Sequence, residues 1–510
     1  MHRVLLIDEI LRAIFVQVGD ENEIKNTSRR AFARLATVCH AWKDPALDFL
    51  WARLPSTDPL VALLPTAKYH DGAYAFVAEP SPEDLATLGS YASRVRSIHH
   101  NGQPSSKFLS HNLAHITIHG GLLFPALTTL SLHMADPARR ALAPTLYLST
   151  RLRSLSLDVG FVRRGAHPGE SLCAFVDGLT YVAEHLERLT VRGRAGERIL
   201  DAVTSMSGLR SLSLCVGGDL SPRALAALSN FARLQELRIQ LDGMDADALR
   251  EALATPVARF ASLEFLNVRG APEVLETLFD SFPESSRLHT VRIESDLKPR
   301  SVDNWTPVLD HLACKARYTL HDLTLEVLTA FCEVPDLATP PKLHFTVSTL
   351  APLAAVTDLR SFKLDASVPP DLNDANIAQL ARWWPRIEQL VLWTCPSDAF
   401  DYPTYFTMQP RATPASLRVL ADACPALRTV ALPMDIAAVP ASPAADGQST
   451  PHATLERITI GCVKKGADTD AQGFAACLHA CFSRLESIEI ECGDDEPWAA
   501  LQEAYAALQT

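Results

Sequence analysis

The chain has 510 residues and a formal net charge of −12, from 47 Lys and Arg against 59 Asp and Glu. A single hydrophobic core stops growing at about 250–300 residues, so this length predicts several domains or an array of repeats. The excess of acid argues against general binding to nucleic acid or anionic membranes, because both need a clustered cationic face. Hydrophobic residues at 47% and charged residues at 21% exclude a wholly disordered chain.

The cysteines and the hydrophobic runs indicate the compartment. Eleven cysteines are scattered without a CxxC pair, which is typical of reduced thiols in the cytoplasm or nucleus. The apolar run Val4–Ile7 is too short for a signal peptide and is broken by Asp8 and Glu9. No run approaches the ~20 apolar residues of a membrane span. We therefore expect a cytoplasmic or nuclear protein, or one present in both compartments.

Residues 1–64 are predicted to form a small all-α module. Apolar residues recur there at three- and four-residue steps, as on one face of a helix. Eight basic and eight acidic groups cancel within this segment, so the net charge lies beyond it. A segment of this size buries only about 60% of its surface by itself. It therefore packs on the rest of the chain or keeps an apolar face for a partner.

A set of residues in this module resembles the F-box in order and spacing. These residues are Leu5, Leu6, Ile7, Glu9, Ile10, Leu11, Ile14, Phe15, Leu35, Val38, Cys39, Trp42, Leu47 and Trp51. The chain departs from the family at Asp8, where the family usually has Pro. The resemblance implies that these residues bind the adaptor subunit of an SCF ubiquitin ligase and, through it, the cullin scaffold. The alternative is that the helices only cap the following domain.

One pattern, apolar-x-x-apolar-x-apolar, recurs along the remaining chain. Its last two apolar positions alternate, as in a short strand with one buried face. Successive copies at Leu186, Leu209, Leu234, Leu263 and Leu288 are 23, 25, 29 and 25 residues apart, close to the period of leucine-rich repeats. Amphipathic helices are expected between the strands, for example over residues 245–262 and 372–387. Copies begin at Leu113, Leu127, Leu152, Leu186, Leu209, Leu234, Leu263, Leu288, Leu320, Leu359, Ile387, Leu427, Leu455 and Leu485.

The repeats resemble the irregular, helix-rich leucine-rich repeats that follow F-boxes in fungal-type proteins. The predicted fold class is α/β, a strand–helix solenoid shaped as a horseshoe, with a parallel sheet on its concave face. Each repeat buries its apolar face against its neighbours, so no single large core is needed. The expected organisation is a module at 1–64, an irregular connection at 65–90 and a solenoid at 91–510. Insertions are expected near 335–341 and 433–451.

Catalytic motifs are missing from the sequence. It contains no GxGxxG, GxxxxGK[ST], HExxH or GxSxG, so we expect no enzyme, no cofactor and no metal site. His111, His115 and His119 are spaced by four, but the local period of two favours a strand over a helical metal site. Cys477 and Cys481 fall on the apolar face of a predicted helix, where buried structural cysteines are the simpler interpretation.

The outward positions of the predicted strands suggest a binding surface. Arginine forks suit carboxylates and phosphates, and aromatic residues often anchor interfaces. We therefore expect an acidic or phosphorylated protein segment to bind there. The alternative is a solvated face whose charges pair across strands, as Arg292 with Glu326. The predicted substrate-binding residues are Arg188, Arg192, Arg238, Phe265, Arg269, Arg292 and Trp393.

Together these features predict a non-catalytic substrate receptor of a cullin-type SCF E3 ubiquitin ligase. The F-box would bind the adaptor, and the repeats would capture a protein substrate for ubiquitination. The alternative is a leucine-rich-repeat scaffold for protein interactions without a link to a ligase.

Overall fold

The computed structural model describes most of the chain as two compact units, Met1–Leu234 and Gln235–Thr510. Each unit is described by itself below. The described residues are 7–18, 26–70, 73–100, 122–134, 144–161, 170–182, 184–218, 220–255, 259–297, 302–329, 344–366, 369–393, 410–435, 452, 454–461, 471–482, 485–490 and 496–509.

The first unit begins with three packed helices, α1 (Asp8–Val18), α2 (Asn26–Leu35) and α3 (His40–Ala52). The ring of Phe15 lies at the centre of their core, with its centroid 5.8 Å from that of Phe32 and 5.9 Å from that of Phe49. Leu11 and Ala46 are also fully buried in this cluster. The apolar periodicity of the sequence therefore produces a small helical core, as predicted.

Helix α3 leads directly into the parallel sheet of the first unit. Strand β1 (Arg53–Leu54) follows α3 without a loop and pairs in parallel with β4 (Ser97–His99). Arg94, just before β4, donates hydrogen bonds to Asp44 and Asp48 of α3. The three helices are thus joined to the first strands by main-chain pairing and by ion pairs.

The segment between β1 and β4 is more regular than the sequence suggested. Residues 65–90 were expected to be an irregular connection, but they contain an antiparallel hairpin and most of a helix. Helix α5 starts with a capping box between Ser81 and Asp84, which satisfies two helix N-terminal donors. The elements of this segment are α4 (Asp58–Val61), β2 (Ala67–His70), β3 (Ala73–Phe76) and α5 (Pro82–Ala92).

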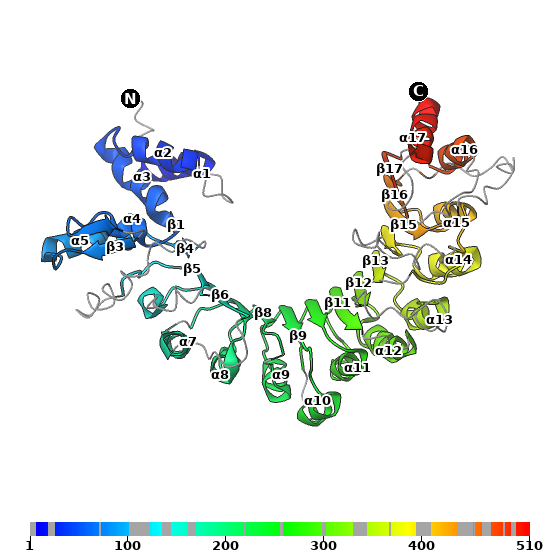
Figure 1. The fold of residues 1–510 in the computed structure, drawn as a ribbon, viewed down its shortest axis with the longest axis horizontal. Coiled ribbons are helices and arrows are strands. Elements are labelled where there is room, and N and C mark those ends of the chain that lie inside the picture. The colour runs from blue at the N-terminus through cyan, green and yellow to red at the C-terminus, as the bar shows by residue number, and fades with distance from the viewer. Residues whose placement is uncertain are drawn as a thin grey trace. The chain divides into compact units, whose positions relative to one another are not determined.

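Each unit contains a row of parallel strands (Figure 1). In the first unit the row continues after β4 with β5 (Thr129–His133), β6 (Ser154–Gly160), β7 (Arg188–Gly193) and β8 (Ser211–Cys215). In the second unit it consists of β9 (Glu236–Gln240), β10 (Phe265–Arg269), β11 (Thr290–Leu297), β12 (Asp322–Thr329), β13 (Ser361–Ala366), β14 (Gln389–Val391), β15 (Thr429–Pro433), β16 (Arg457–Gly461) and β17 (Ser487–Ile490).

The buried positions of the repeat pattern lie in register on neighbouring strands. Leu266 of β10 pairs with Leu237 and Val291, and all three side chains are fully buried. Every copy of the pattern from Leu127 onward contains strand residues, whereas the copy at Leu113 lies outside the described residues. Burial of each large apolar side chain contributes about 1.5–3 kcal/mol, so these ladders hold the repeats together.

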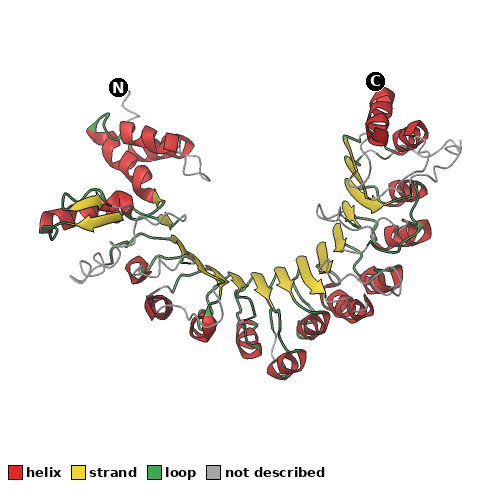
Figure 2. Cartoon of the chain, viewed as in Figure 1, coloured by secondary structure: helices red, strands yellow, loops and turns green. Residues whose placement is uncertain are grey.

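Helices cover one face of the strands in each unit (Figure 2). In β4 to β13 the residues that alternate with the buried ones are exposed or half-buried on the other side, which we call the open face. In β14, β15 and β16 the corresponding residues Val391, Ala431 and Thr459 are buried. The helices of the first unit's repeats are η5 (Pro144–Tyr147), α7 (Glu170–Val182), α8 (Gly196–Thr204) and α9 (Pro222–Leu228). Those of the second unit are α10 (Ala246–Ala252), α11 (Pro272–Asp280), η6 (Val302–Asn304), α12 (Trp305–Ala316), α13 (Val347–Leu350), η9 (Ala351–Ala355), α14 (Asp374–Trp383), α15 (Ala415–Ala423), α16 (Ala471–Cys481) and α17 (Glu496–Gln509).

Helix ends follow the local sequence. Ser221 caps α9 by accepting a hydrogen bond from the amide of Ala224, and Pro222 is the first helical residue. The helix expected over residues 245–262 is shorter and ends at Ala252, because the next residue leaves helical geometry. The predicted fold class is confirmed: the chain is an α/β, leucine-rich-repeat-like solenoid preceded by helices. The expected insertions at 335–341 and 433–451 lie mostly outside the described residues.

Replacement of two glycines by alanine tests this packing, because the two changes in the free energy of unfolding should have opposite signs. A Cβ on Gly461 of β16 would lie 2.5 Å from the ring atom Cε3 of Trp393, whereas a Cβ on Gly89 of α5 meets nothing within 4 Å. We expect Gly461→Ala to lower the free energy of unfolding by about 1–3 kcal/mol through overpacking. Gly89→Ala should raise it by about 0.5–1 kcal/mol, because alanine favours the helix. Urea unfolding measures both, and equal effects would contradict this packing.

Candidate functional site

Helix α1 carries an apolar stripe beside the side that it buries. Leu11 and Phe15 point into the helical core and are each 1% exposed. Ile7, Ile14 and Val18 are 44%, 40% and 41% exposed. Ile7 directly precedes α1, and its carbonyl accepts a hydrogen bond from the amide of Leu11. The spacing of seven and four therefore places these three side chains on the same side. We call Ile7, the half-buried Ile10, Ile14 and Val18 the α1 stripe.

The structure divides the predicted adaptor-binding residues into core and surface. Trp51 is buried, and its ring centroid lies 4.9 Å from that of Tyr91 on α5. Glu9 and Val38 are exposed, Val38 by 49%. Leu35, Cys39, Trp42 and Leu47 are half-buried, whereas Leu5 and Leu6 lie outside the described residues. Val18 was not among the predicted residues, because it lies C-terminal to the first block of residues that resembles the F-box, which ends at Phe15.

Asp8 takes part in a chain of ion pairs between α1 and α3. It accepts a hydrogen bond of 2.6 Å from Arg12, which donates a second one of 2.8 Å to Asp48. The hydrogen bond to Asp8, followed by the one to Asp48, raises the pKa of Arg12. Asp8 also lies in the first turn of α1, where a negative charge is favourable. The residue that departs from the F-box pattern is thus compatible with a stable α1.

The predicted substrate-binding residues of the first unit lie on β7. Arg188 and Arg192 are both exposed, as expected. Arg192 forms an ion pair of 2.9 Å with Asp158 of β6, and its guanidinium carbon lies 5.5 Å from the ring centroid of Phe161. Asp158 also lies 3.0 Å from the imidazole of His133. The charge of Arg192 is therefore already balanced within the sheet.

The predicted residues of the second unit lie on the open face of β9, β10 and β11. The guanidinium carbons of Arg238 and Arg292 lie 5.2 Å and 6.0 Å from the ring centroid of Phe265. Arg269 instead pairs with Asp242 at 3.2 Å. Register places Arg292 opposite Thr324 rather than Glu326, which faces Glu294. The structure thus brings Arg238, Phe265 and Arg292 together as one cluster.

Trp393 lies in the core, so its predicted place on the binding surface is wrong. The repeat pattern predicts it as an outward aromatic anchor, but the structure buries it completely, and its indole N–H donates a 3.1 Å hydrogen bond to the carbonyl of Ala366. Strand β14 ends at Val391, so the alternation of inward and outward side chains does not continue to Trp393. Its ring packs over Gly461, where a glycine leaves the necessary space.

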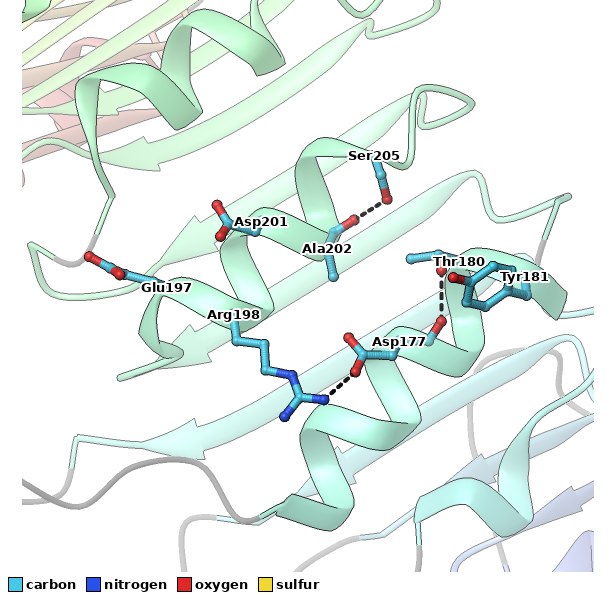
Figure 3. A pocket seen from close by; sticks show the side chains of 8 residues that line it. All are labelled: Asp177, Thr180, Tyr181, Glu197, Arg198, Asp201, Ala202 and Ser205. Atoms are coloured by element: carbon cyan, nitrogen blue, oxygen red, sulfur yellow. Dashed lines mark hydrogen bonds and ion pairs between the residues drawn. The ribbon is translucent and has the colours of Figure 1, made fainter.

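A shallow groove of about 490 Å³ lies between α7 and α8 of the first unit. Figure 3 shows Arg198 reaching from α8 to Asp177 on α7, where it donates a 2.6 Å hydrogen bond. The hydroxyl of Thr180 donates to the carbonyl of Asp177. Ser205 of this groove likewise donates its hydroxyl hydrogen bond to a main-chain carbonyl, that of Ala202.

The described residues contain no group of three or more His, Cys, Asp and Glu side chains that could hold a metal ion. His111, His115 and His119 lie outside them. The same residues include no helix with the length and hydrophobicity needed to cross a membrane.

The two cysteines of α16 differ in their surroundings. Cys477 is half-buried and Cys481 is buried. A hydrogen bond from Cys481 lowers the pKa of Cys477 to about 7, and the same bond raises the pKa of Cys481. Burial raises the pKa of Cys424 to about 11. We therefore expect Cys477 to be the most reactive of these three thiols at neutral pH.

Comparisons with known proteins add little to this geometry. No family model and no curated protein matches the chain. Among solved structures, it is similar to a chain in the crystal structure of the Rad7 and Elc1 complex in yeast. The identity is 14% and the TM-score 0.32, over 75% of this chain and 97% of that one. At these values the likeness carries no argument about function.

The cysteine pair gives a pH-dependent prediction. Only the thiolate reacts with iodoacetamide, so alkylation of Cys477 should reach half its maximal rate near pH 7. Cys481→Ala removes the hydrogen bond that favours the thiolate, so this midpoint should move to higher pH. Mass spectrometry of peptides measures both rates, with Cys424 as the unreactive control. An unchanged midpoint in Cys481→Ala contradicts the proposed role of the hydrogen bond.

Proposed function

We propose that this protein is a non-catalytic substrate receptor of a cullin-type SCF ubiquitin ligase. In this function the three N-terminal helices bind the adaptor subunit, and through it the cullin scaffold. The strand–helix solenoid captures a protein substrate for ubiquitination.

The α1 stripe is the observation that carries the proposal. A helical module that buries Leu11 and Phe15 satisfies its own core and still exposes Ile7, Ile14 and Val18 on the adjoining side of the same helix. Contiguous exposed apolar residues of this kind mark interaction sites. Ile7, Ile10 and Ile14 also belong to the F-box resemblance. We assign adaptor contact to the stripe, and we assign Leu11 and Phe15 the role of supporting it from behind. Trp51 instead packs on Tyr91 of α5.

The connection between α3 and β1 joins the proposed adaptor-binding helices directly to the first strands of the first unit. No loop separates α3 from the first strand of the sheet. Arg94, which lies just before β4, donates a hydrogen bond to Asp44 of α3. Burial alone would lower the pKa of Arg94, but its hydrogen bonds to Asp44 and Asp48 raise it overall, so the guanidinium stays charged and paired. The proposed adaptor-binding helices are thus joined to the repeats of the first unit by strand pairing and by ion pairs.

Substitution on the α1 stripe tests the proposal. We expect Ile14→Glu to reduce capture of a purified SCF adaptor subunit by at least about tenfold, because a charge replaces an isoleucine whose burial contributes about 1.5–3 kcal/mol. Val16 is 37% exposed and lies about half a turn away from the stripe on the same helix. Val16→Glu therefore adds the same charge to the opposite face and should leave capture unchanged.

The outcomes separate the two candidate functions. If the unmodified chain does not bind the adaptor, the ligase proposal fails, and a repeat scaffold without a ligase link is the better description. Equal losses in Ile14→Glu and Val16→Glu contradict the assignment of the contact to the stripe. Circular dichroism of both variants controls for loss of the helical module, and both should match the unmodified chain.

A further inference from the structure

Three side chains form a stack on the open face of the second unit. The guanidinium groups of Arg238 on β9 and Arg292 on β11 both contact the ring of Phe265, at 5.2 Å and 6.0 Å from its centroid. Strand β10 pairs with both β9 and β11, so the two cations approach the ring from neighbouring strands on either side. Both arginines are exposed, whereas Phe265 is half-buried.

The stack holds two guanidinium groups in place without neutralising them. Cation–π contacts fix the plane of a guanidinium while its N–H donors stay available at the edges. Among the residues that the structure describes, neither Arg238 nor Arg292 forms an ion pair. This distinguishes them from Arg192 and Arg269, which pair with Asp158 and Asp242. Two ordered cations therefore remain available for an anionic ligand.

Strand register extends this arrangement into a row across five strands. The row consists of Arg238, Asn267, Arg292, Thr324 and Lys363. A cation occupies every second strand, and the residues between them are uncharged hydrogen-bonding side chains. Neighbouring strands are about 4.8 Å apart, so cations in the row recur at about 9.6 Å. Lys363 forms an ion pair with Asp365 at 4.0 Å, which partly neutralises its charge. Arg238 and Arg292 are therefore the stronger anion-binding positions of the row.

The distance of about 9.6 Å between cations of the row fits one peptide conformation better than the others. A polyproline II segment has three residues per turn and a rise of about 3.1 Å, so every third side chain faces the same way at about 9.3 Å. An extended strand repeats a face at about 6.6 Å, and a helix places neighbouring side chains about 5–6 Å apart. The polyproline II repeat matches the row most closely.

Acidic residues on both sides limit what can bind to the row. Glu236 and Asp322 lie two residues before it on their strands, and Glu294, Glu326 and Asp365 lie two residues after it. A polyacidic segment would meet these like charges at every shifted register, which disfavours it. Isolated carboxylates separated by neutral residues avoid this repulsion.

We propose that the row formed by Arg238, Asn267, Arg292, Thr324 and Lys363 binds a polyproline II segment with a carboxylate side chain at every third position. The inference rests on the proposed function, because it names the class of substrate that the solenoid captures. Arg238 and Arg292 bind two successive carboxylates, and Phe265 positions the arginines. Asn267 and Thr324 bind the main chain between the carboxylates.

Binding of a synthetic peptide to the full chain tests this proposal. The probe is a fluorescent peptide of proline, alanine and serine with glutamate at every third position, followed by anisotropy at low salt. We expect Arg238→Gln and Arg292→Gln each to weaken binding by about tenfold, since hydrogen bonds to charged groups are lost. Arg233→Gln removes an equal charge from an exposed turn residue before β9 and should change binding by less than about twofold.

Phe265 and the peptide spacing provide further readouts. Phe265→Leu keeps both arginines and should weaken binding by about threefold, whereas Phe265→Trp should retain it, because tryptophan also accepts cation–π contacts. Peptides with glutamate at every second or every fourth position should bind at least about fivefold more weakly than the three-residue spacing.

Several results would overturn the inference. They are equal losses in Arg238→Gln and Arg233→Gln, equal affinity for all three spacings, or binding of only a phosphoserine version of the peptide. Adaptor capture by the same preparations is measured in parallel. Adaptor capture without peptide binding rejects the peptide proposal and leaves the ligase proposal standing. Peptide binding without adaptor capture rejects the ligase proposal and leaves the peptide-binding site standing.

Discussion

Each unit depends on buried apolar side chains of one strand that are held in register with those of the next strand. Leu237, Leu266 and Val291 illustrate this, since each is fully buried and contributes only through its neighbours. A strand of five residues cannot bury a core by itself. The same register that aligns the buried positions necessarily aligns the outward ones. The chemistry of the open face is therefore a consequence of the core.

The sequence was sufficient for the repeat architecture because the same apolar-x-x-apolar-x-apolar pattern precedes or spans one strand after another. It was less informative wherever the period is interrupted. Trp393 lies beyond the end of β14, so its burial depends on contact with Gly461, a residue far away in the chain. The hairpin and helix within residues 65–90 carry no repeat signal, although Ser81-Pro82 before Asp84 is a local helix start that the sequence does contain.

The N-terminal helices show a different limit of sequence analysis. Periodicity identifies which residues are apolar, but it does not decide which side of an apolar helix faces inward. Leu11 and Ile14 are both part of the same pattern, and only the packing of α2 and α3 separates the buried residue from the exposed one. The resemblance to the F-box grouped both as adaptor contacts. The three-dimensional packing divides them into a residue that supports the helix and one that can reach a partner.

Charge on the open face depends on position as well as composition. Five arginines were predicted there, but Arg192 and Arg269 have acidic partners on their own face, at Asp158 and Asp242. Arg238 and Arg292 contact an aromatic ring instead, which orders a guanidinium without cancelling its charge. A net charge of −12 therefore does not prevent anion binding, since what a ligand meets within a Debye length of about 8 Å is the local arrangement. On the open face of the second unit, Phe265 lies on the strand between Arg238 and Arg292 and therefore determines this local arrangement of charge.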